Sequence, residues 1–220
     1  MQTIPKVYIN NPAFRFYSDK KKNQNDLFMG FENEIIYSDF WGKGLDRKLI
    51  LFLHKYPYLY FKDEPSISGI EINSHPFSWD WFVKNNDFIQ DIYNIAASSK
   101  RFRISDACGF HIHINKKYFN QKHLIKMIKF FYEPKHGNFL FKISKRRRCE
   151  FNWFSSNQMP SSFRRWYSLH YDMDVKGCSY DDIFKKIAKM KYKQFDDMFG
   201  NKSSILNLSL KNTIEIRLFK

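Results

Sequence analysis

Residues 110–114 have the sequence Phe-His-Ile-His-Ile, in which apolar and ionisable side chains alternate without a break. Side chains alternate between the two faces of a β-strand, so residues two apart point the same way. The pattern predicts a strand over residues 108–115, with His111 and His113 on one face and isoleucines on the other.

Three further segments have the same alternation, each with acidic residues at the polar positions. Glu32 and Glu34 lie in a predicted strand over 28–37, and Glu71 lies alone between isoleucines in one over 68–73. If these strands share a sheet with the closing segment 213–219, their apolar faces pack under helices. The opposite face then gathers seven ionisable side chains, namely Glu32, Glu34, Glu71, His111, His113, Glu215 and Arg217.

Such a gathering of carboxylates favours a cation. Carboxylates that lie close together repel one another and take up protons unless a positive charge neutralises them. Carboxylate oxygens suit Mg²⁺ or Mn²⁺, and imidazole is compatible with Mn²⁺ or Zn²⁺. The alternative is an antiparallel sheet whose second face is simply exposed to water, which would account for one Glu-x-Glu or His-x-His pair. Four strands with the same pattern favour the cation.

The rest of the chain predicts an α+β fold, with a curved, mostly antiparallel sheet and helices packed on one face. We expect residues 1–25 to be an irregular arm and residues 26–220 to form a single catalytic domain. The stretch 139–156 is ambiguous and is compatible with a strand, a basic turn and a second strand. Further strands are expected at 205–210 and 213–219, and helical spacing is found at 45–55, 78–98, 121–132 and 181–199.

Composition excludes several classes of protein. The 220 residues are 43 % apolar, which is ample for a core and excludes a disordered tail. The longest apolar run, residues 49–53, is far too short to cross a bilayer, and the first six residues lack the apolar region that would predict a signal peptide. Three scattered cysteines predict a reducing, cytoplasmic location. The net charge of +15 is compatible with an acidic substrate, an acidic partner or nucleic acid.

The polar segments also resemble the motifs of one family, in the same order along the chain. Residues 29–34 (Met-Gly-Phe-Glu-Asn-Glu) are similar to its Gly-Val-Glu-x-Glu opening, and residues 68–76 to its Gly-Val-Glu-Leu-Val-Ser-x-Pro segment. Residues 108–114 resemble Cys-Gly-x-His-Val-His-Val, and residues 206–219 resemble a closing Leu-Asn-Leu followed by Thr-Val-Glu-Phe-Arg. The chain thus resembles the amidoligases, relatives of glutamine synthetase and glutamate–cysteine ligase.

The resemblance implies a glutamine-synthetase-like fold and an ATP- and Mg²⁺-dependent ligase that forms an amide through an acyl phosphate, with Mn²⁺ as a substitute ion. Its substrates would be a small-molecule or peptide carboxylate and an amine. Catalysis would depend on Glu32, Arg217 and Arg148, and ATP would be held by His111, His113 and Arg217. The metal ligands that the resemblance implies are Glu32, Glu34, Glu71, His111 and Glu215.

Two other functions remain open from the sequence. Histidines and carboxylates can also activate water in a metal-dependent hydrolase. A degenerate, non-catalytic relative could instead bind nucleic acid or protein through its basic charge and interleaved aromatics. The chain has no glycine-rich phosphate loop, so a bound nucleotide would need metal and Arg or Lys to hold its phosphates. The aromatics that favour nucleic acid are Phe151, Trp153, Phe163 and Trp166.

Overall fold

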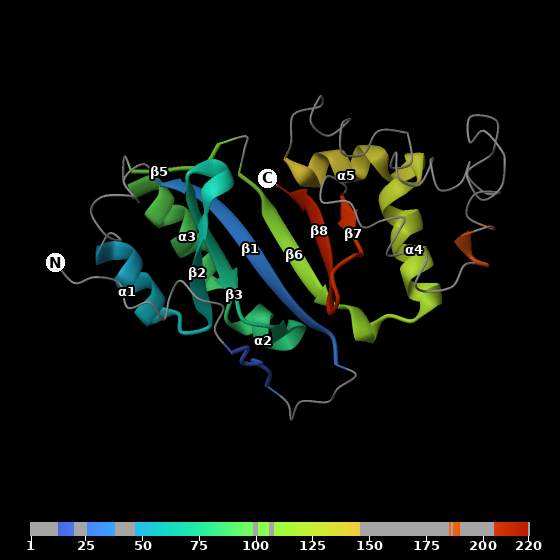
Figure 1. Ribbon diagram of the computed structural model, residues 1–220, viewed down its shortest axis with the longest axis horizontal. Coiled ribbons are helices and arrows are strands. Elements are labelled where there is room, and N and C mark those ends of the chain that lie inside the picture. The colour runs from blue at the N-terminus through green and yellow to red at the C-terminus, as the bar shows by residue number, and fades with distance from the viewer. Residues whose placement is uncertain are drawn as a thin grey trace. The chain divides into compact units, whose positions relative to one another are not determined.

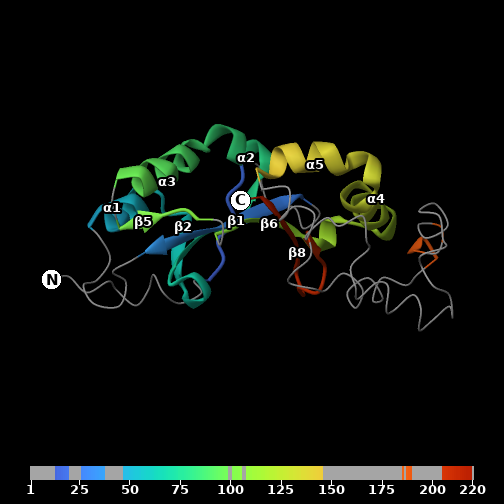
Figure 2. The same ribbon diagram turned by 90° about the horizontal axis from the view of Figure 1, so that it is seen from above.

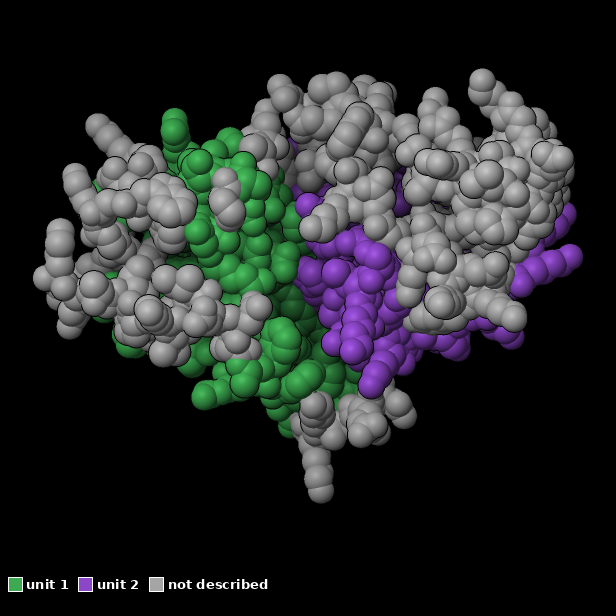
Figure 3. All heavy atoms as spheres, in the orientation of Figure 1, with its two compact units in different colours: residues 1–112 green, residues 113–220 purple. Residues whose placement is uncertain are grey.

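The described strands and helices form an α+β fold, as the sequence predicts, and eight strands of this part of the chain form an open antiparallel sheet (Figure 1). A computed structural model describes residues 13–19, 26–37, 47–98, 101–105, 108–145, 185, 187–189 and 205–219. Contacts divide the chain into two compact units, residues 1–112 and 113–220, coloured separately in Figure 3. The division falls inside one strand, between Ile112 and His113. The single domain over 26–220 and the arm over 1–25 remain predictions.

Unit 1 is built around the long strand β1 (Phe28–Tyr37), the range that the alternation predicts. The strand order is β2-β3-β1-β6, and the pairings of β1 with β3 and of β2 with β3 are antiparallel. Two short strands, β4 and β5, also pair with β1. The other strands of this unit are β2 (Leu59–Glu64), β3 (Gly69–Ser74), β4 (Phe77–Ser78), β5 (Phe102–Arg103) and the beginning of β6 (Phe110–Asn115).

The close approach of β3 to β1 requires a glycine at its first residue. A Cβ added to Gly69 would lie 2.1 Å from the carbonyl oxygen of Ile35. Gly69 pairs with Ile36, and this register then places every later residue of β3. A side chain at this position would push the strands apart and shift the polar residues described below.

The apolar face of unit 1 packs under helices, which lie on one side of its strands in Figure 2. Phe31 and Ile35 of β1 are buried with Ile72 of β3, and helix residues such as Phe88 complete the core. Asn33, between Glu32 and Glu34 on β1, is also buried. The helical segments are α1 (Arg47–Lys55), η2 (Pro65–Ile67), α2 (Trp79–Lys84) and α3 (Asp87–Ser98).

The helix that the spacing predicts over 78–98 is two helices. Ser78 caps the first, and its hydroxyl accepts a hydrogen bond from the Trp81 N–H at 3.3 Å. The break comes at Asn85, whose side chain donates to the Trp81 carbonyl at 2.8 Å and competes with the next helical turn. Apolar spacing continues across this break, which is why periodicity alone joins the two helices.

Residues 13–19 also belong to unit 1. Tyr17 forms a bridge with Phe77, and its backbone exchanges hydrogen bonds with Pro76 and Ser78 at 2.9 Å. This part of the chain is therefore attached to the edge of the sheet by backbone hydrogen bonds.

Among the residues that the structure describes, unit 2 has the strand order β6-β8-β7, the α-helices α4 and α5 and two 3₁₀ helices. Asn120 caps α4, because its side-chain oxygen accepts from the His123 N–H at 3.0 Å, and the predicted range 121–132 is confirmed. The beginning of the ambiguous stretch 139–156 is helical and not a strand: residues 137–144 form a helix, with Leu140 and Ser144 buried one turn apart. The elements of unit 2 are η3 (Lys116–Tyr118), α4 (Gln121–Tyr132), η4 (Pro134–His136), α5 (Gly137–Ser144), β7 (Leu206–Asn207) and β8 (Thr213–Phe219).

The closing strands are confirmed, although β7 is shorter than the predicted 205–210. The predicted helix over 181–199 and the basic segment from residue 146 lie outside the residues that the structure describes, apart from residues 185 and 187–189.

Candidate functional site

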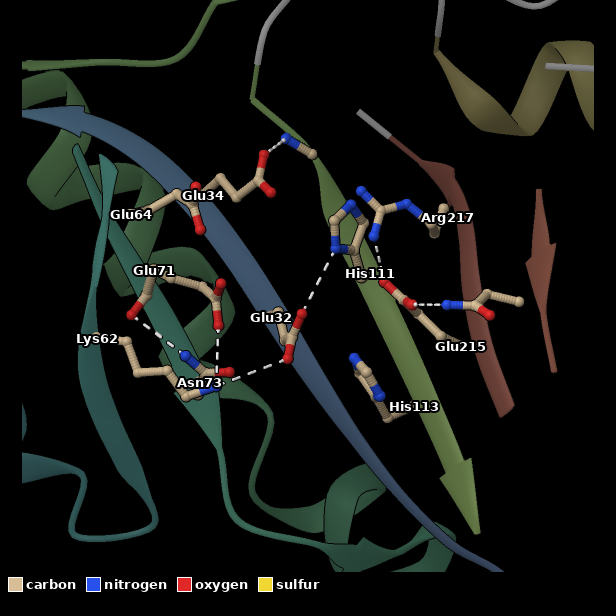
Figure 4. Close-up of polar contacts among 12 residues, drawn as sticks. Glu32, Glu34, Lys62, Glu64, Glu71, Asn73, His111, His113, Glu215 and Arg217 are labelled. Atoms are coloured by element: carbon tan, nitrogen blue, oxygen red, sulfur yellow. Dashed lines mark hydrogen bonds and ion pairs between the residues drawn. The ribbon is translucent and has the colours of Figure 1, made fainter. Parts of the chain in front are cut away.

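The register of β1 on β3 brings three of the predicted carboxylates of unit 1 onto one face of the sheet. Glu34 lies opposite Glu71, and Glu32 lies opposite Asn73. Opposite residues in an antiparallel pair have Cβ atoms about 5 Å apart, so these carboxylates are neighbours. This face, drawn in Figure 4, is opposite to the face that packs on the helices.

A lysine from β2 lies among these acids. Lys62 pairs with Glu71 in the β2–β3 register, and its ammonium nitrogen is 3.3 Å from Glu71 Oε1 (Figure 4). The same nitrogen is 3.9 Å from Glu32 Oε1. The Glu71 side chain is only 11 % exposed, against 22 % for Glu32 and 31 % for Lys62. The Lys62 ammonium therefore shares its charge between two partly buried carboxylates.

The surroundings of Glu71 work against its ionisation. Burial raises the pKa of the Glu71 carboxyl, and the neighbouring charge of Glu32 raises it further. Asn73 and Lys62 act in the opposite direction through their hydrogen bonds and, for Lys62, its charge. Burial likewise raises the pKa of the nearby Tyr60 hydroxyl, and both glutamates add to that shift. The positive charge of Lys62 therefore does not fully balance the negative charge of the acidic groups around Glu71.

His111 adds an imidazole to the same group. Its Nδ1 is 3.6 Å from Glu32 Oε2, and the side chain is 5 % exposed. The ring packs over Gly109, where an added Cβ would lie 2.6 Å from His111 Nε2. Glu34 also holds this segment, because its Oε2 accepts a hydrogen bond from the Gly109 N–H at 2.7 Å. Glu34 and His111, two of the predicted ligands, thus both contact Gly109, which directly precedes β6.

Unit 2 carries a second polar group on β7 and β8. Asn207 lies opposite Glu215, and its amide donates to Glu215 Oε2 at 2.8 Å. Arg217, two residues along β8, donates from Nη1 to Glu215 Oε1 at 2.5 Å. The Glu215 side chain is only 6 % exposed. An amide contacts one of its carboxylate oxygens and a guanidinium contacts the other (Figure 4).

His113 belongs to unit 2, where its Nδ1 is 3.3 Å from the Thr213 hydroxyl at the start of β8. His111 and His113 are two residues apart on β6, the strand that their alternation with isoleucines predicts. Arg148, the remaining predicted site residue, lies outside the residues that the structure describes.

The structure thus gathers Glu32, Glu34, Glu71 and His111 within unit 1. It places Glu215 and Arg217 in direct contact within unit 2. Their roles as metal ligands, ATP-binding residues or catalytic residues remain predictions.

Sequence reasoning missed the two polar partners of these acids, Lys62 and Asn207. The alternation of Tyr60, Lys62 and Glu64 along β2 could have indicated Lys62, although the buried aromatic pair Tyr60-Phe61 obscures it. Asn207 lies inside the Leu-Asn-Leu motif, which was used for the family resemblance and not as a source of site residues.

The chemistry of the unit 1 group suits a hard cation. Carboxylate oxygens suit Mg²⁺ or Mn²⁺, and the imidazole is compatible with Mn²⁺ or Zn²⁺. A Lys62 ammonium bound between carboxylates also marks a place where positive charge is favoured. Glu32, Glu71 and His111 are thus residue types that can bind a divalent cation.

Comparisons with known proteins add no assignment. In the part of the chain that the structure describes, every helix is too short or too polar to cross a bilayer. No family model, no curated protein and no solved structure matches the chain.

Proposed function

We propose that the chain is an ATP- and Mg²⁺-dependent ligase that joins a carboxylate to an amine, on a glutamine-synthetase-like fold. The observation that supports this most directly is the row of carboxylates on β1 and β3 around the Lys62 ammonium. Glu32 and Glu71 share one lysine there, and Glu34 lies opposite Glu71 in the strand register, so the group favours further positive charge. The choice of a ligase reaction rests on the sequence motifs, which occur in the same order as in the amidoligases.

The chemistry needs positive charge for a simple reason. A carboxylate is a poor acylating agent, so one of its oxygens first attacks the γ-phosphorus of ATP, and the bond from that phosphorus to ADP breaks. The amine nitrogen then attacks the carbonyl carbon of the acyl phosphate, inorganic phosphate leaves, and the amine loses a proton to a base. A divalent cation supplies neutralisation of the phosphate charge that otherwise repels the carboxylate.

The residues of the chain have separate tasks in this proposal. Glu32, Glu34, Glu71 and His111 bind the cation. Arg217 stabilises the transferring phosphoryl oxygens, and Glu215 holds its guanidinium in position. The participation of Glu215 and Arg217 in the same reaction rests on the family resemblance alone.

A test uses the full chain with ATP, Mg²⁺ or Mn²⁺ and pools of carboxylates and amines, and it measures release of ADP and phosphate. Glu32→Gln and Glu215→Gln remove one charge each at nearly constant shape, and we expect both to lower the rate at least about tenfold. Asp80→Asn removes one exposed carboxylate on α2 and serves as the matched control.

Turnover at the parental rate in both glutamate variants would refute the ligase. A transition metal that co-purifies at full occupancy, with no affinity for nucleotide, would instead favour the metal-dependent hydrolase. Titration of Mn²⁺ into Glu71→Gln separates the two parts of the proposal, because it measures cation binding without any substrate.

A further inference from the structure

Unit 2 presents a strongly basic surface that the proposed reaction does not use. Residues 113–145 contain eight lysines and only one acidic residue, Glu133. That glutamate is already paired, 2.9 Å from the Lys135 ammonium and 3.6 Å from His136 Nε2. The α4–α5 basic surface, as we define it, consists of Lys117, Tyr118, Lys122, Lys126, Lys129, Phe130, Phe139 and Lys142.

Three of these lysines follow one line along α4. Lys122, Lys126 and Lys129 are four and three residues apart, the spacing that places side chains above one another on a helix. Like charges at this spacing repel one another and destabilise the helix by a few tenths of a kcal/mol per pair. No acidic side chain is present on α4 to offset this repulsion. A polyanion would offset it.

The opposite side of α4 is occupied by the protein core. Leu124, Ile128 and Phe131 are buried, so the apolar stripe of the helix is not available for insertion into a lipid surface. The lysine stripe is thus the outer face of a helix that is anchored by its apolar face. This arrangement favours a soluble polyanion over a membrane.

Exposed aromatic rings accompany the lysines. Phe139 is 52 % exposed and Phe130 is 38 % exposed, and their ring centroids are 6.2 Å apart. The Phe130 ring also lies 5.1 Å from the ring of His136. Tyr118, before the start of α4, is 42 % exposed. Apolar rings exposed beside lysines contribute nothing to binding an acidic protein through charge, whereas they give nucleic-acid bases a face on which to stack.

We propose that the α4–α5 basic surface binds single-stranded nucleic acid, with its lysines on the phosphates and Phe130 and Phe139 stacked on bases. The lysine line supplies an attraction that does not depend on sequence and is sensitive to salt. The rings supply the part of the binding that requires a base. This inference is independent of the ligase proposal, because it uses none of its residues.

The test measures fluorescence anisotropy of labelled oligo(dT) and oligo(U) with the full chain at several salt concentrations. We expect the triple variant Lys122→Gln/Lys126→Gln/Lys129→Gln to bind at least about tenfold more weakly and to have a salt slope smaller by about 2. Replacement of the same three lysines by Arg should retain binding, which separates charge from folding. Phe139→Leu should weaken binding by roughly fivefold or more.

The matched control removes three exposed lysines elsewhere, as Lys55→Gln/Lys84→Gln/Lys211→Gln, and we expect it to change affinity less than threefold. Equal weakening by this control would overturn the proposal, because diffuse net charge would then explain the binding. Full affinity in Phe139→Leu would also overturn it, as would equally tight binding to polyglutamate or to vesicles containing anionic lipid.

Discussion

The ion pair between Lys62 and Glu71 permits a quantitative test of the unit 1 group. The pair is 3.3 Å long, and its side chains are 31 % and 11 % exposed. Exposed pairs contribute about 0–1 kcal/mol, and removal of one partner from a fully buried pair costs about 3–5 kcal/mol. This pair lies between the two limits, so we expect a coupling free energy of about 1–2 kcal/mol between Lys62→Gln and Glu71→Gln at pH 8 in metal-free buffer.

The coupling should depend on pH with a definite sign. Burial and Glu32 raise the pKa of Glu71 above its unfolded value, so the folded protein keeps this proton at a pH where the unfolded chain has lost it. Glu71 therefore lowers the free energy of unfolding as pH rises from about 4.3, the usual Glu value, through the folded pKa. Lys62 attracts only the ionised form, so its coupling to Glu71 is present above that range and vanishes near pH 4.

The assay is a double-mutant cycle from urea unfolding of the parent, both single variants and the double variant at pH 8 and pH 4. Glu64→Gln, an acid farther along β2, is the matched control for Glu71→Gln and should couple to Lys62→Gln by less than about 0.5 kcal/mol. A coupling that is absent at pH 8, or equal at both pH values, would refute the charge-sharing arrangement. Residual destabilisation by Lys62→Gln in the Glu71→Gln background is expected, because the ammonium also contacts Glu32.

Three further outcomes follow from particular contacts. Gly109→Ala should displace the His111 ring, since the new Cβ would lie 2.6 Å from Nε2, and Mn²⁺ affinity measured by titration should fall about tenfold; unchanged affinity would mean that the ring does not bind the ion. Asn120→Ala should lower the free energy of unfolding by about 1 kcal/mol through loss of the α4 cap, with Asn120→Asp as the control that keeps the cap. The hydrogen bonds from Lys55 and, second, from Tyr56 lower the pKa of Asp91; Tyr56→Phe removes the second of these, at 2.5 Å, so the pKa of Asp91 should rise part of the way toward its ordinary value in a carboxyl NMR titration, and an unmoved titration would contradict the bond.

Elements whose packing agrees with their local pattern could be predicted from the sequence. β1 alternates between Phe31 and Ile35 on the core face and Glu32 and Glu34 on the other, and its observed bounds match the prediction. α4 matches as well, because a side-chain cap and a buried stripe lie at the expected spacing. In both elements one face is buried and the other is polar, so periodicity carries most of the information.

Other elements depend on contacts that local pattern does not encode. Apolar spacing joins α2 to α3, although the side chain of Asn85 bonds back to the Trp81 carbonyl and ends the first helix. Residues 139–144 contain enough large apolar residues for either a strand or a helix, and burial of Leu140 and Ser144 one turn apart identifies the helix. β2 is obscured because three consecutive residues at its beginning, Leu59 to Phe61, are all buried.

The candidate site, like the fold, has one part that the local sequence pattern predicts and one part that depends on distant contacts. Alternation along one strand shows which side chains share a face, so Glu32 and Glu34 could be identified without coordinates. The charge that balances them depends on which strands are neighbours and in what register, and both are set by distant packing such as the approach of Gly69 to Ile35. A shift of β2 by one residue against β3 would turn Lys62 to the opposite face and leave Glu71 with Glu32 as its nearest charge. The acids of this site are therefore a property of the sequence, whereas their neutralisation is a property of the fold.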